Sequence, residues 1–159
     1  MKVLGIDPGF GRMGVAIVEK VEGGREKLLY STCLVTPKTN LFAERLGYLE
    51  VKLDKILKIW QPDAGAIERL FFTTNQKTAM QVAEVRGMVL ALLTRKGVGS
   101  HEYTPGEIKV AVTGSGRANK GAVAGMVSRL LPGLGKLKFD DEYDAIAVAL
   151  THIARARGK

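Results

Sequence analysis

The sequence predicts an α/β fold, a mixed five-stranded sheet flanked by helices, in which a three-strand antiparallel meander precedes two parallel strands. Three observations support this prediction. Short apolar runs separated by turn residues occupy residues 3–35. Apolar residues then recur at three- and four-residue spacing over residues 41–60, which indicates an amphipathic helix. Further along, strand-like and helix-like segments alternate, an order typical of parallel strands joined by helices.

The meander is predicted from three apolar segments, at residues 3–6 and at about 13–19 and 27–35. The first segment ends at Asp7, and Pro8, Gly9 and Gly11 follow it. These residue types favour a tight turn, because proline fixes φ and glycine tolerates conformations that other residues avoid. A second turn is expected at residues 21–25, so the three strands can pair in chain order.

The remaining elements alternate between helix and strand. The helix at 41–60 should end before Pro62. The further predicted elements are strands at 64–67 and 99–103 and helices at 75–96, 105–112, 119–131 and 141–156. The sequence shows no internal repeat and no linker, so we expect a single domain spanning residues 1–159.

The charge of the chain points to a polyanionic partner. The formal net charge is +8, with 24 Lys and Arg residues against 16 Asp and Glu residues. No acidic residue occurs between Ile108 and Phe139. The basic residues of that stretch are Lys109, Arg117, Lys120, Arg129, Lys136 and Lys138. A solvated surface usually mixes charges of both signs, so a stretch this long with one sign favours nucleic-acid binding.

Composition also excludes several classes of protein. Cys33 is the single cysteine and lies in an apolar run, which predicts a buried core thiol and excludes an internal disulfide. One cysteine and two histidines make a zinc site or a cysteine nucleophile improbable. Asp7 comes too early for a signal peptide, and no apolar run approaches the length of a membrane span. We therefore expect a cytoplasmic protein without membrane contact.

Four acidic residues stand at the ends of predicted elements. Asp7 and Glu68 each end an apolar strand, while Asp141 and Asp144 open the last helix three residues apart, on one helical face. Each has an ordinary interpretation, as a turn residue, an exposed strand end or an acid favoured at a helix N-terminus. Together they favour a cation site, because gathered like charges are costly unless a cation neutralises them. Hard divalent ions take such oxygen ligands.

Motifs along nearly the whole chain carry a family resemblance. They are Gly-Ile-Asp-Pro-Gly at 5–9, Ile-Glu-Arg-Leu-Phe at 67–71, Ala-Glu-Val-Arg-Gly at 83–87, Gly-Ser-Gly-Arg-Ala-Asn-Lys at 114–120, Asp-Glu-Tyr-Asp-Ala-Ile-Ala-Val-Ala at 141–149, and Thr-His at 151–152. In this order and spacing the sequence resembles the RuvC family of crossover-junction endodeoxyribonucleases, within the ribonuclease H-like superfamily. The resemblance implies a ribonuclease H-like sheet. It also implies an enzyme that resolves four-way (Holliday) DNA junctions in homologous recombination and repair.

The resemblance also implies a mechanism and a metal site. Paired, symmetric phosphodiester hydrolysis would use two Mg²⁺ ions per active site, with Mn²⁺ as a substitute, and would leave 5′-phosphate and 3′-hydroxyl ends. Asp7 would bridge the two ions, Glu68 would hold one ion and orient the attacking water, and Asp144 with Asp141 would complete the coordination. The neighbouring Asp140 leaves open which acid takes the third position.

The same resemblance assigns DNA contacts to the basic stretch and to the loop after Glu68. Lys120 would contact the scissile or an adjacent phosphate, and Lys109 resembles a second such lysine. Phe71 matches an aromatic residue that stacks on a base at the opened centre of the junction. Arg69 and Arg117 are further candidate DNA contacts, and Arg69 could also shift the pKa of Glu68.

The helix at 75–96 resembles the family's dimer helix. The residues assigned to a dimer interface are Ala79, Val82, Ala83, Arg86 and Gly87. The small side chains among them would let two helices approach closely, although they could also pack on the chain's own sheet. A homodimer would present two active sites to symmetric strands of a junction. RuvA and RuvB branch-migration proteins are the further partners that the family implies.

Two alternatives remain open at this point. The chain could be a related ribonuclease H-like nuclease that acts on another nucleic acid. It could also be a junction-binding protein without catalytic activity, although all four acids are present. Cleavage preference for particular bases cannot be read from the sequence.

Overall fold

The computed structural model describes residues 1–69 and 76–156. Its elements, in chain order, are β1 (Lys2–Asp7), β2 (Arg12–Lys20), β3 (Glu26–Val35), α1 (Phe42–Trp60), β4 (Ala64–Glu68), α2 (Gln76–Arg95), β5 (Gly99–Tyr103), α3 (Pro105–Thr113), α4 (Lys120–Leu130) and α5 (Asp140–Ala156). This order is the one predicted from the sequence. The element ends differ from the prediction by a residue or two, as at Asp140, which opens α5 one residue earlier than expected.

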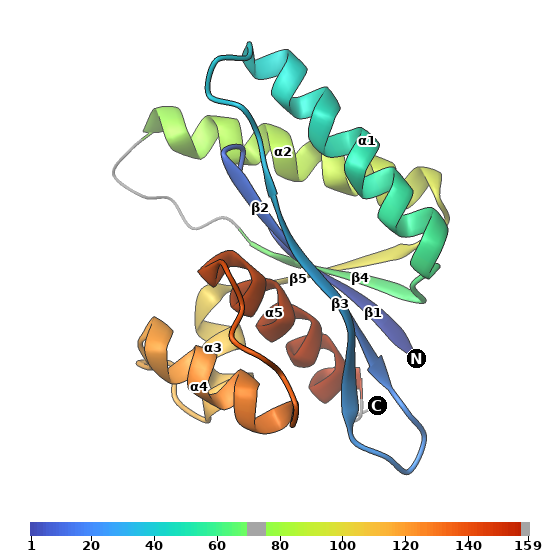
Figure 1. The fold of residues 1–159 in the computed structure, drawn as a ribbon, viewed down its shortest axis with the longest axis vertical. Helices are drawn as coiled ribbons and strands as arrows, with labels where there is room; N and C mark the ends of the chain where they lie inside the picture. The colour runs from blue at the N-terminus through green and yellow to red at the C-terminus, as the bar shows by residue number, and fades with distance from the viewer. Residues whose placement is uncertain (70–75, 157–159) are drawn as a thin grey trace.

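The strands form one five-stranded sheet in the order β3-β2-β1-β4-β5. β1 and β2 pair antiparallel, as do β2 and β3, whereas β4 pairs parallel with both β1 and β5. The mixed sheet predicted from the sequence is therefore confirmed. Both of its faces are covered, one by α1 and α2 and the other by α3, α4 and α5 (Figure 1).

Each face of the sheet has its own apolar core, because successive strand residues point to opposite sides. Leu4 and Ile6 of β1 pack with the α1 residues Leu49 and Leu53. Val3, which precedes Leu4, packs instead on the side of α5. Since both faces are buried, β1 and β2 are almost continuously apolar, as is usual for strands covered on both sides.

Helix α1 ends where the sequence predicts. Gln61 adopts a left-handed conformation with φ 45° and donates its backbone N–H to Leu57 O, which closes the last turn. Pro62 follows and cannot continue the helix. The chain then enters β4, whose backbone begins beside β1 at the pair Val3 and Ala64.

Two glycines let α5 lie unusually close to the sheet. A Cβ atom on Gly14 would lie 1.9 Å from the carbonyl oxygen of Asp141, and one on Gly5 would lie 2.1 Å from that of Ala145. Neither position can hold a larger side chain without displacing backbone. Since Gly14 pairs with Asp7 across β1 and β2, this close approach brings the first turn of α5 beside the end of β1.

Two expectations from composition, about the burial of Cys33 and about membrane spans, can be compared with the structure. Cys33 on β3 is only partly buried, so the prediction of a core thiol is wrong. It lies on an edge strand, near Asp141 and Arg12, and partial burial raises the pKa of its thiol to about 11. Among the residues that the structure describes, no helix is long and apolar enough to cross a membrane.

Candidate active site

Two neighbouring parallel strands place Asp7 and Glu68 side by side. Ile6 on β1 pairs with Ile67 on β4, and the next residue of each strand is the acid. Parallel strands end at the same edge of a sheet, so both carboxylates emerge there. The backbone of Glu68 is in turn paired with Tyr103, the last residue of β5.

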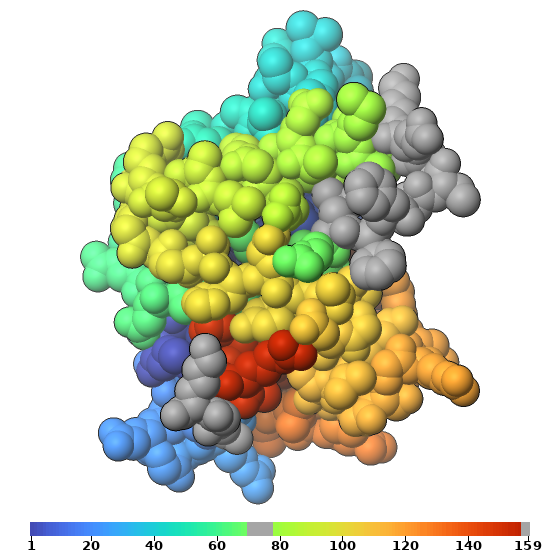
Figure 2. Space-filling model, turned by 180° about the vertical axis from the view of Figure 1, so that it is seen from behind, coloured from blue at the N-terminus to red at the C-terminus, as the bar shows by residue number. Residues whose placement is uncertain are grey.

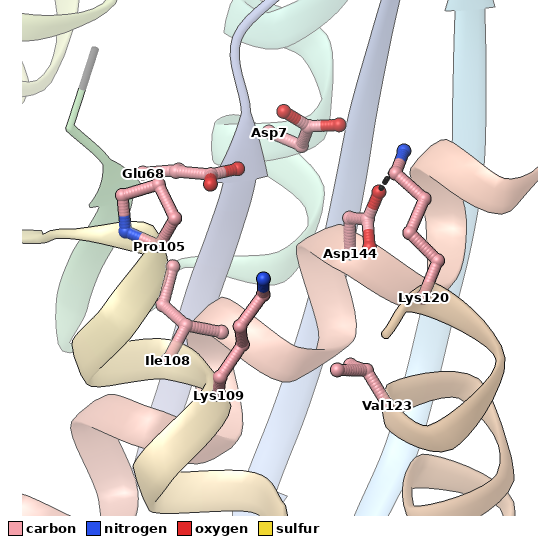
Figure 3. Close-up of a pocket in the computed structure, with 8 residues that line it drawn as sticks. All are labelled: Asp7, Glu68, Pro105, Ile108, Lys109, Lys120, Val123 and Asp144. Carbon is pink, nitrogen blue, oxygen red and sulfur yellow. Dashed lines mark hydrogen bonds and ion pairs between the residues drawn. The ribbon is translucent and has the colours of Figure 1, made fainter. Parts of the chain in front are cut away.

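The N-terminal part of α5 contributes a third acid to this edge. Asp144 lines a cavity of about 270 Å³ together with Asp7 and Glu68, and the three carboxylates come from three different elements (Figure 3). The other residues that line the cavity are Pro105, Ile108, Lys109, Lys120 and Val123. The predicted acids at positions 7, 68 and 144 are thus brought together by the fold.

Two lysines enter the cavity from the helices that cover this face. Lys120 opens α4, and its Nζ lies 3.3 Å from Asp144 Oδ2. Lys109 of α3 points its ammonium group into the space between Glu68 and Asp144 (Figure 3). The side chain of Asn119 caps α4 by accepting from the backbone N–H of Ala122, and this fixes the turn from which Lys120 projects.

The helix that carries Lys109 is held by a reciprocal cap. Thr104 Oγ1 accepts from the backbone N–H of Glu107 at 3.2 Å, and the Glu107 carboxylate accepts from the backbone N–H of Thr104 at 2.8 Å. Pro105 occupies the first helical turn, where its missing N–H costs nothing. Thr104 directly follows β5, so the cap orients α3 from the same sheet edge as the acids.

Burial and mutual repulsion disturb the carboxylates of the cavity. The pKa of Asp7 lies well above its usual value, chiefly because of burial and then because of repulsion by Glu68 and Asp144. Burial also raises the pKa of Glu68, with a further rise from Asp144, while interaction with Asp7 and Lys120 opposes the rise. Their mutual interaction thus raises the pKa of Asp7 and lowers that of Glu68. Asp144 has a pKa raised by burial, which the neighbouring Lys120 partly offsets.

Asp141 occupies a different position from the other three acids. It does not line the cavity, although its charge contributes to the raised pKa of Asp7. Its Oδ2 atom is shielded from solvent and makes no hydrogen bond within the described chain, but lies 3.4 Å from Nε of Arg12. The neighbouring Asp140 is exposed and, with Lys120 and Asp144, lines a second small hollow. Of these two acids, Asp141 is the one whose charge acts on Asp7.

The donor set fits a hard divalent cation. All the acidic groups offer carboxylate oxygens, and one buried oxygen of Asp141 has no hydrogen-bond donor in the described residues. The raised pKa of Asp7 is the response expected of carboxylates that share a site without a neutralising ion. Within residues 1–69 and 76–156, however, no group of three or more acidic, histidine or cysteine side chains stands in a geometry that could hold a metal ion.

The remaining predicted DNA contacts lie around the cavity or outside the described residues. Phe71 falls in the segment 70–75, outside the part of the chain that the structure describes. Arg69 is exposed next to Glu68, but it is not among the main causes of the shifted pKa of that acid. The expected influence of Arg69 on Glu68 is therefore not supported. Arg117 is exposed in the turn between α3 and α4 and does not line the cavity.

The predicted interface residues divide between two sides of α2. Ala83 and Gly87 are exposed, and α2 forms part of the surface seen in the upper half of Figure 2. Ala79 is buried against the chain's own core, and Val82 is half-buried. Arg86 is ion-paired with Glu102 of β5 within the chain. The outward small residues therefore form a narrower strip than the sequence suggested.

Several residues of the site were missed by the sequence reading. Pro105, Ile108 and Val123 form apolar parts of the cavity wall, yet they look like ordinary helix residues in the sequence. Arg12 follows the Pro-Gly turn and belongs to none of the motifs, so nothing in the sequence linked it to Asp141. Only the packing of α5 against β2 makes Arg12 and Asp141 neighbours.

Comparison with known proteins agrees with this arrangement. The sequence profile of the family described as "Crossover junction endodeoxyribonuclease RuvC" matches residues 3–152. The chain belongs to the RuvC family of crossover junction endodeoxyribonucleases. A relative from Brachyspira hyodysenteriae that carries this name is 41% identical over 99% of this chain and 96% of its own length. One from Mycobacterium avium is 40% identical over 98% of this chain and 83% of its own.

Solved structures lead to the same family. The structure described as "T. thermophilus RuvC in complex with Holliday junction substrate" superposes with a TM-score of 0.93, at 32% identity over 99% of this chain and 96% of that chain. The yeast mitochondrial Holliday junction resolvase Ydc2 has a TM-score of 0.71 at 15% identity, over 96% of this chain and 77% of that chain. At that identity it shows a common fold alone. The ribonuclease H-like fold class predicted from the sequence is thus confirmed.

Proposed function

We propose that the chain resolves four-way DNA junctions by metal-dependent hydrolysis of phosphodiester bonds, as a RuvC-family nuclease. The observation that carries this proposal is the convergence of Asp7, Glu68 and Asp144 on one cavity that also receives Lys109 and Lys120. Acids alone could hold a cation, and lysines alone could bind phosphate. Their combination in one cavity suits a reaction in which a phosphate is attacked beside a bound cation.

The cation would be Mg²⁺, with two ions in each active site and Mn²⁺ as a substitute. Asp7, Glu68 and Asp144 would hold the ions, and Asp141 would join them after a change of its contacts. When bound, the ions would supply an activated water and stabilise the leaving oxygen. Membership of the family supports dependence on a divalent cation, while the number of ions follows from the proposed chemistry.

The chain's own side chains perform three further tasks in this proposal. Glu68, whose raised pKa makes it a better proton acceptor, would orient the attacking water. Lys120 would leave Asp144 to contact an oxygen of the scissile phosphate, and Lys109 would approach the same phosphate from α3. The apolar wall of Ile108 and Val123 would exclude bulk water, which strengthens these charge interactions.

The DNA would be held by the exposed basic residues near the cavity, and by the segment after Glu68. Arg69 and Arg117 are exposed and would contact phosphates, and Phe71 would stack on an unpaired base. A homodimer through the outer strip of α2, with Ala83 and Gly87 at its centre, would place two such sites on symmetric strands. RuvA and RuvB would deliver the junction, in the cytoplasm, to a chain that forms a single nuclease domain over residues 1–159.

The proposal is tested by cleavage of a labelled synthetic four-way junction beside a linear duplex of the same sequence, in Mg²⁺ and in EDTA. Symmetric nicks in the junction alone, lost in EDTA, are expected. Asp7→Asn should lower cutting at least about a thousandfold while junction binding survives, because it removes a ligand but no DNA contact. Equal cutting of the duplex, or cutting of RNA instead, would assign the chain to another branch of the superfamily.

Tight junction binding without cutting, in either Mg²⁺ or Mn²⁺, would contradict catalysis and leave a binding protein. Asp7→Asn that still cuts would contradict the assignment of the site. Glu22→Gln is the matched control, since it also removes one negative charge and Glu22 is exposed in the turn after β2, at the end of that strand away from Asp7. Its cutting rate should equal that of the unaltered chain.

A further inference from the structure

Among the residues that the structure describes, Arg12 is a basic residue that pairs with an acid of the site although no sequence motif includes it. It opens β2 two residues before Gly14, which pairs with Asp7, so it stands at the same edge of the sheet as the cavity. Its Nε lies 3.4 Å from Asp141 Oδ2. Its side chain is 55% exposed, whereas that of Asp141 is 16% exposed. The pair therefore joins a surface cation to a largely buried acid.

The guanidinium of Arg12 has a second contact that fixes its direction. It lies over the ring of Phe139 at 5.9 Å from the ring centre, and Lys138 Nζ lies 5.3 Å from the same ring. A cation over an aromatic face is weakly attracted to it. Lys138 belongs to the acid-free basic stretch of the sequence, so Arg12 extends that basic surface to the edge of the acid cluster.

Arg12 and Asp141 form an ion pair without a hydrogen bond, which suits two groups that separate when other partners bind. The separation is within ion-pair range, yet Asp141 Oδ2 has no hydrogen bond from any residue the structure describes. Breaking the pair therefore sacrifices no hydrogen bond. A divalent ion could take the oxygen, and a DNA phosphate could take the arginine, since guanidinium groups bind phosphate readily.

We propose that Arg12 is a positioning residue that couples DNA binding to metal binding. In the free protein it neutralises Asp141 and competes with a divalent ion for that carboxylate. When a DNA phosphate binds the exposed guanidinium, Asp141 is released toward the acids of the cavity. Metal and junction then strengthen each other's binding, and by thermodynamic linkage the effect is equal in both directions.

This inference rests on the proposed function, because it assumes a divalent ion at the acid cluster and a DNA phosphate beside Arg12. It differs from a general electrostatic effect of one positive charge. Such an effect would weaken metal binding equally in the free protein and on DNA. Competition for Asp141 acts in the free protein alone, because on DNA the arginine is occupied by phosphate.

The test measures binding rather than cutting, with Ca²⁺ as the probe, since Ca²⁺ accepts oxygen ligands in flexible geometry. Calorimetry gives the Ca²⁺ affinity of the free protein. Fluorescence anisotropy gives the affinity for a labelled four-way junction in EDTA and in saturating Ca²⁺, and a denaturing gel checks afterwards that the DNA is intact. The ratio of the two junction affinities measures the coupling.

Arg12→Gln should tighten Ca²⁺ binding by the free protein about fivefold and lower the coupling ratio about fivefold, as loss of one partly exposed ion pair implies. Arg12→Lys should restore part of both values. Phe139→Leu, which keeps the charge but removes the ring, should shift both in the same direction by a smaller factor. Arg25→Gln is the charge-matched control and should change neither.

Two results with the variants would overturn the inference while leaving the proposed metal site in place. One is equal Ca²⁺ affinity in Arg12→Gln and Arg25→Gln. The other is tighter Ca²⁺ binding in Arg12→Gln with an unchanged coupling ratio, which would leave only a general charge effect. Thermal melting in EDTA confirms that each variant is folded. If the unaltered protein binds neither Ca²⁺ nor Mg²⁺, the proposed metal site fails with the inference. If it binds metal and couples through Arg12 but does not cut, only the proposed catalysis fails.

Discussion

The acids that end strands and the acids that open α5 differ in how their charges are balanced. Asp7 and Glu68 emerge from buried strand ends, and burial is the largest cause of their raised pKa values. Asp144 and Asp141 instead have cationic neighbours, Lys120 at 3.3 Å and Arg12 at 3.4 Å. The strand acids are thus positioned rigidly at an electrostatic cost, while the helix acids are held by partners that DNA can compete for.

This difference shows that one site can combine carboxylates in fixed positions with carboxylates that change partners. The sheet fixes where the carboxylates stand, because neighbouring parallel strands cannot shift independently. The helix acids can change partners, because a partly exposed ion pair contributes only about 0–1 kcal/mol. Substitutions on the two sides should therefore have different consequences.

Lys120→Gln should have the largest effect of the changes on the helix side. It removes the cation from the cavity, and we expect junction cutting to fall about a hundredfold, the loss typical of one group that stabilises a transition-state charge. Single-turnover cleavage in saturating Mg²⁺ measures this. Lys136→Gln, an exposed change in the same basic stretch, serves as control. Equal loss in both variants would mean that Lys120 acts only as one of many phosphate contacts.

Gly14→Ala should damage the placement of both helix acids together. Its Cβ would lie 1.9 Å from the carbonyl oxygen of Asp141, so either α5 or β2 must move. We expect a loss of about 2 kcal/mol in the free energy of unfolding, as for overpacked cores, and weaker metal binding. Urea unfolding measures the first quantity. Gly47→Ala, where a Cβ meets nothing within 4 Å, should be neutral or stabilising, and destabilisation there would remove the contrast.

Asp7→Asn should stabilise the metal-free protein more than Asp144→Asn does. Removing the charge at position 7 relieves burial and repulsion, because every main influence on its pKa opposes the charged form. We expect the melting temperature in EDTA to rise by about 3 °C, equivalent to about 1 kcal/mol. Asp144→Asn also leaves Lys120 without its partner, so its melting temperature should rise less. A larger rise for Asp144→Asn would contradict the comparison.

The raised pKa of Asp7 also predicts that the stabilisation by Asp7→Asn depends on pH. A carboxyl whose pKa is raised in the folded state loses stability as pH rises from its unfolded pKa through the folded one. The gap in unfolding free energy between Asp7→Asn and the unaltered protein should therefore be small in acid and widen with rising pH. Urea unfolding across a pH series in EDTA measures it. A gap that narrows with rising pH would show that the folded protein stabilises the charged form of the Asp7 carboxyl group.

Thr104→Ala should have the smallest effect, because it alters a helix that carries a lysine of the cavity but none of the cavity's acids. Loss of the cap on α3 should cost about 1 kcal/mol of unfolding free energy. Cutting should decrease only slightly through the position of Lys109. Thr104→Ser, which keeps the hydroxyl, is the matched control. Loss of metal affinity in Thr104→Ala would show that α3 also positions the acids.

The sequence by itself determined the order of the elements and the residues around which a site could form. Apolar periodicity and turn residues fixed the strands and helices, because these depend on local spacing. The family motifs identified Asp7, Glu68, Asp144 and Lys120, and all four lie at the cavity. The prediction that Cys33 is buried was wrong, since the apolar run around it does not reveal that β3 lies at a sheet edge.

Only the tertiary structure decided how these residues interact. Two glycines that look like ordinary spacers set the distance between α5 and the sheet, and hence the position of Asp141. The pairing of Arg12 with Asp141 joins residues far apart in the chain, and the raised pKa of Asp7 depends on burial and on charges from other elements. Burial and repulsion depend on distances in three dimensions. Local spacing in the sequence does not contain those distances, which explains why they appeared only in the folded chain.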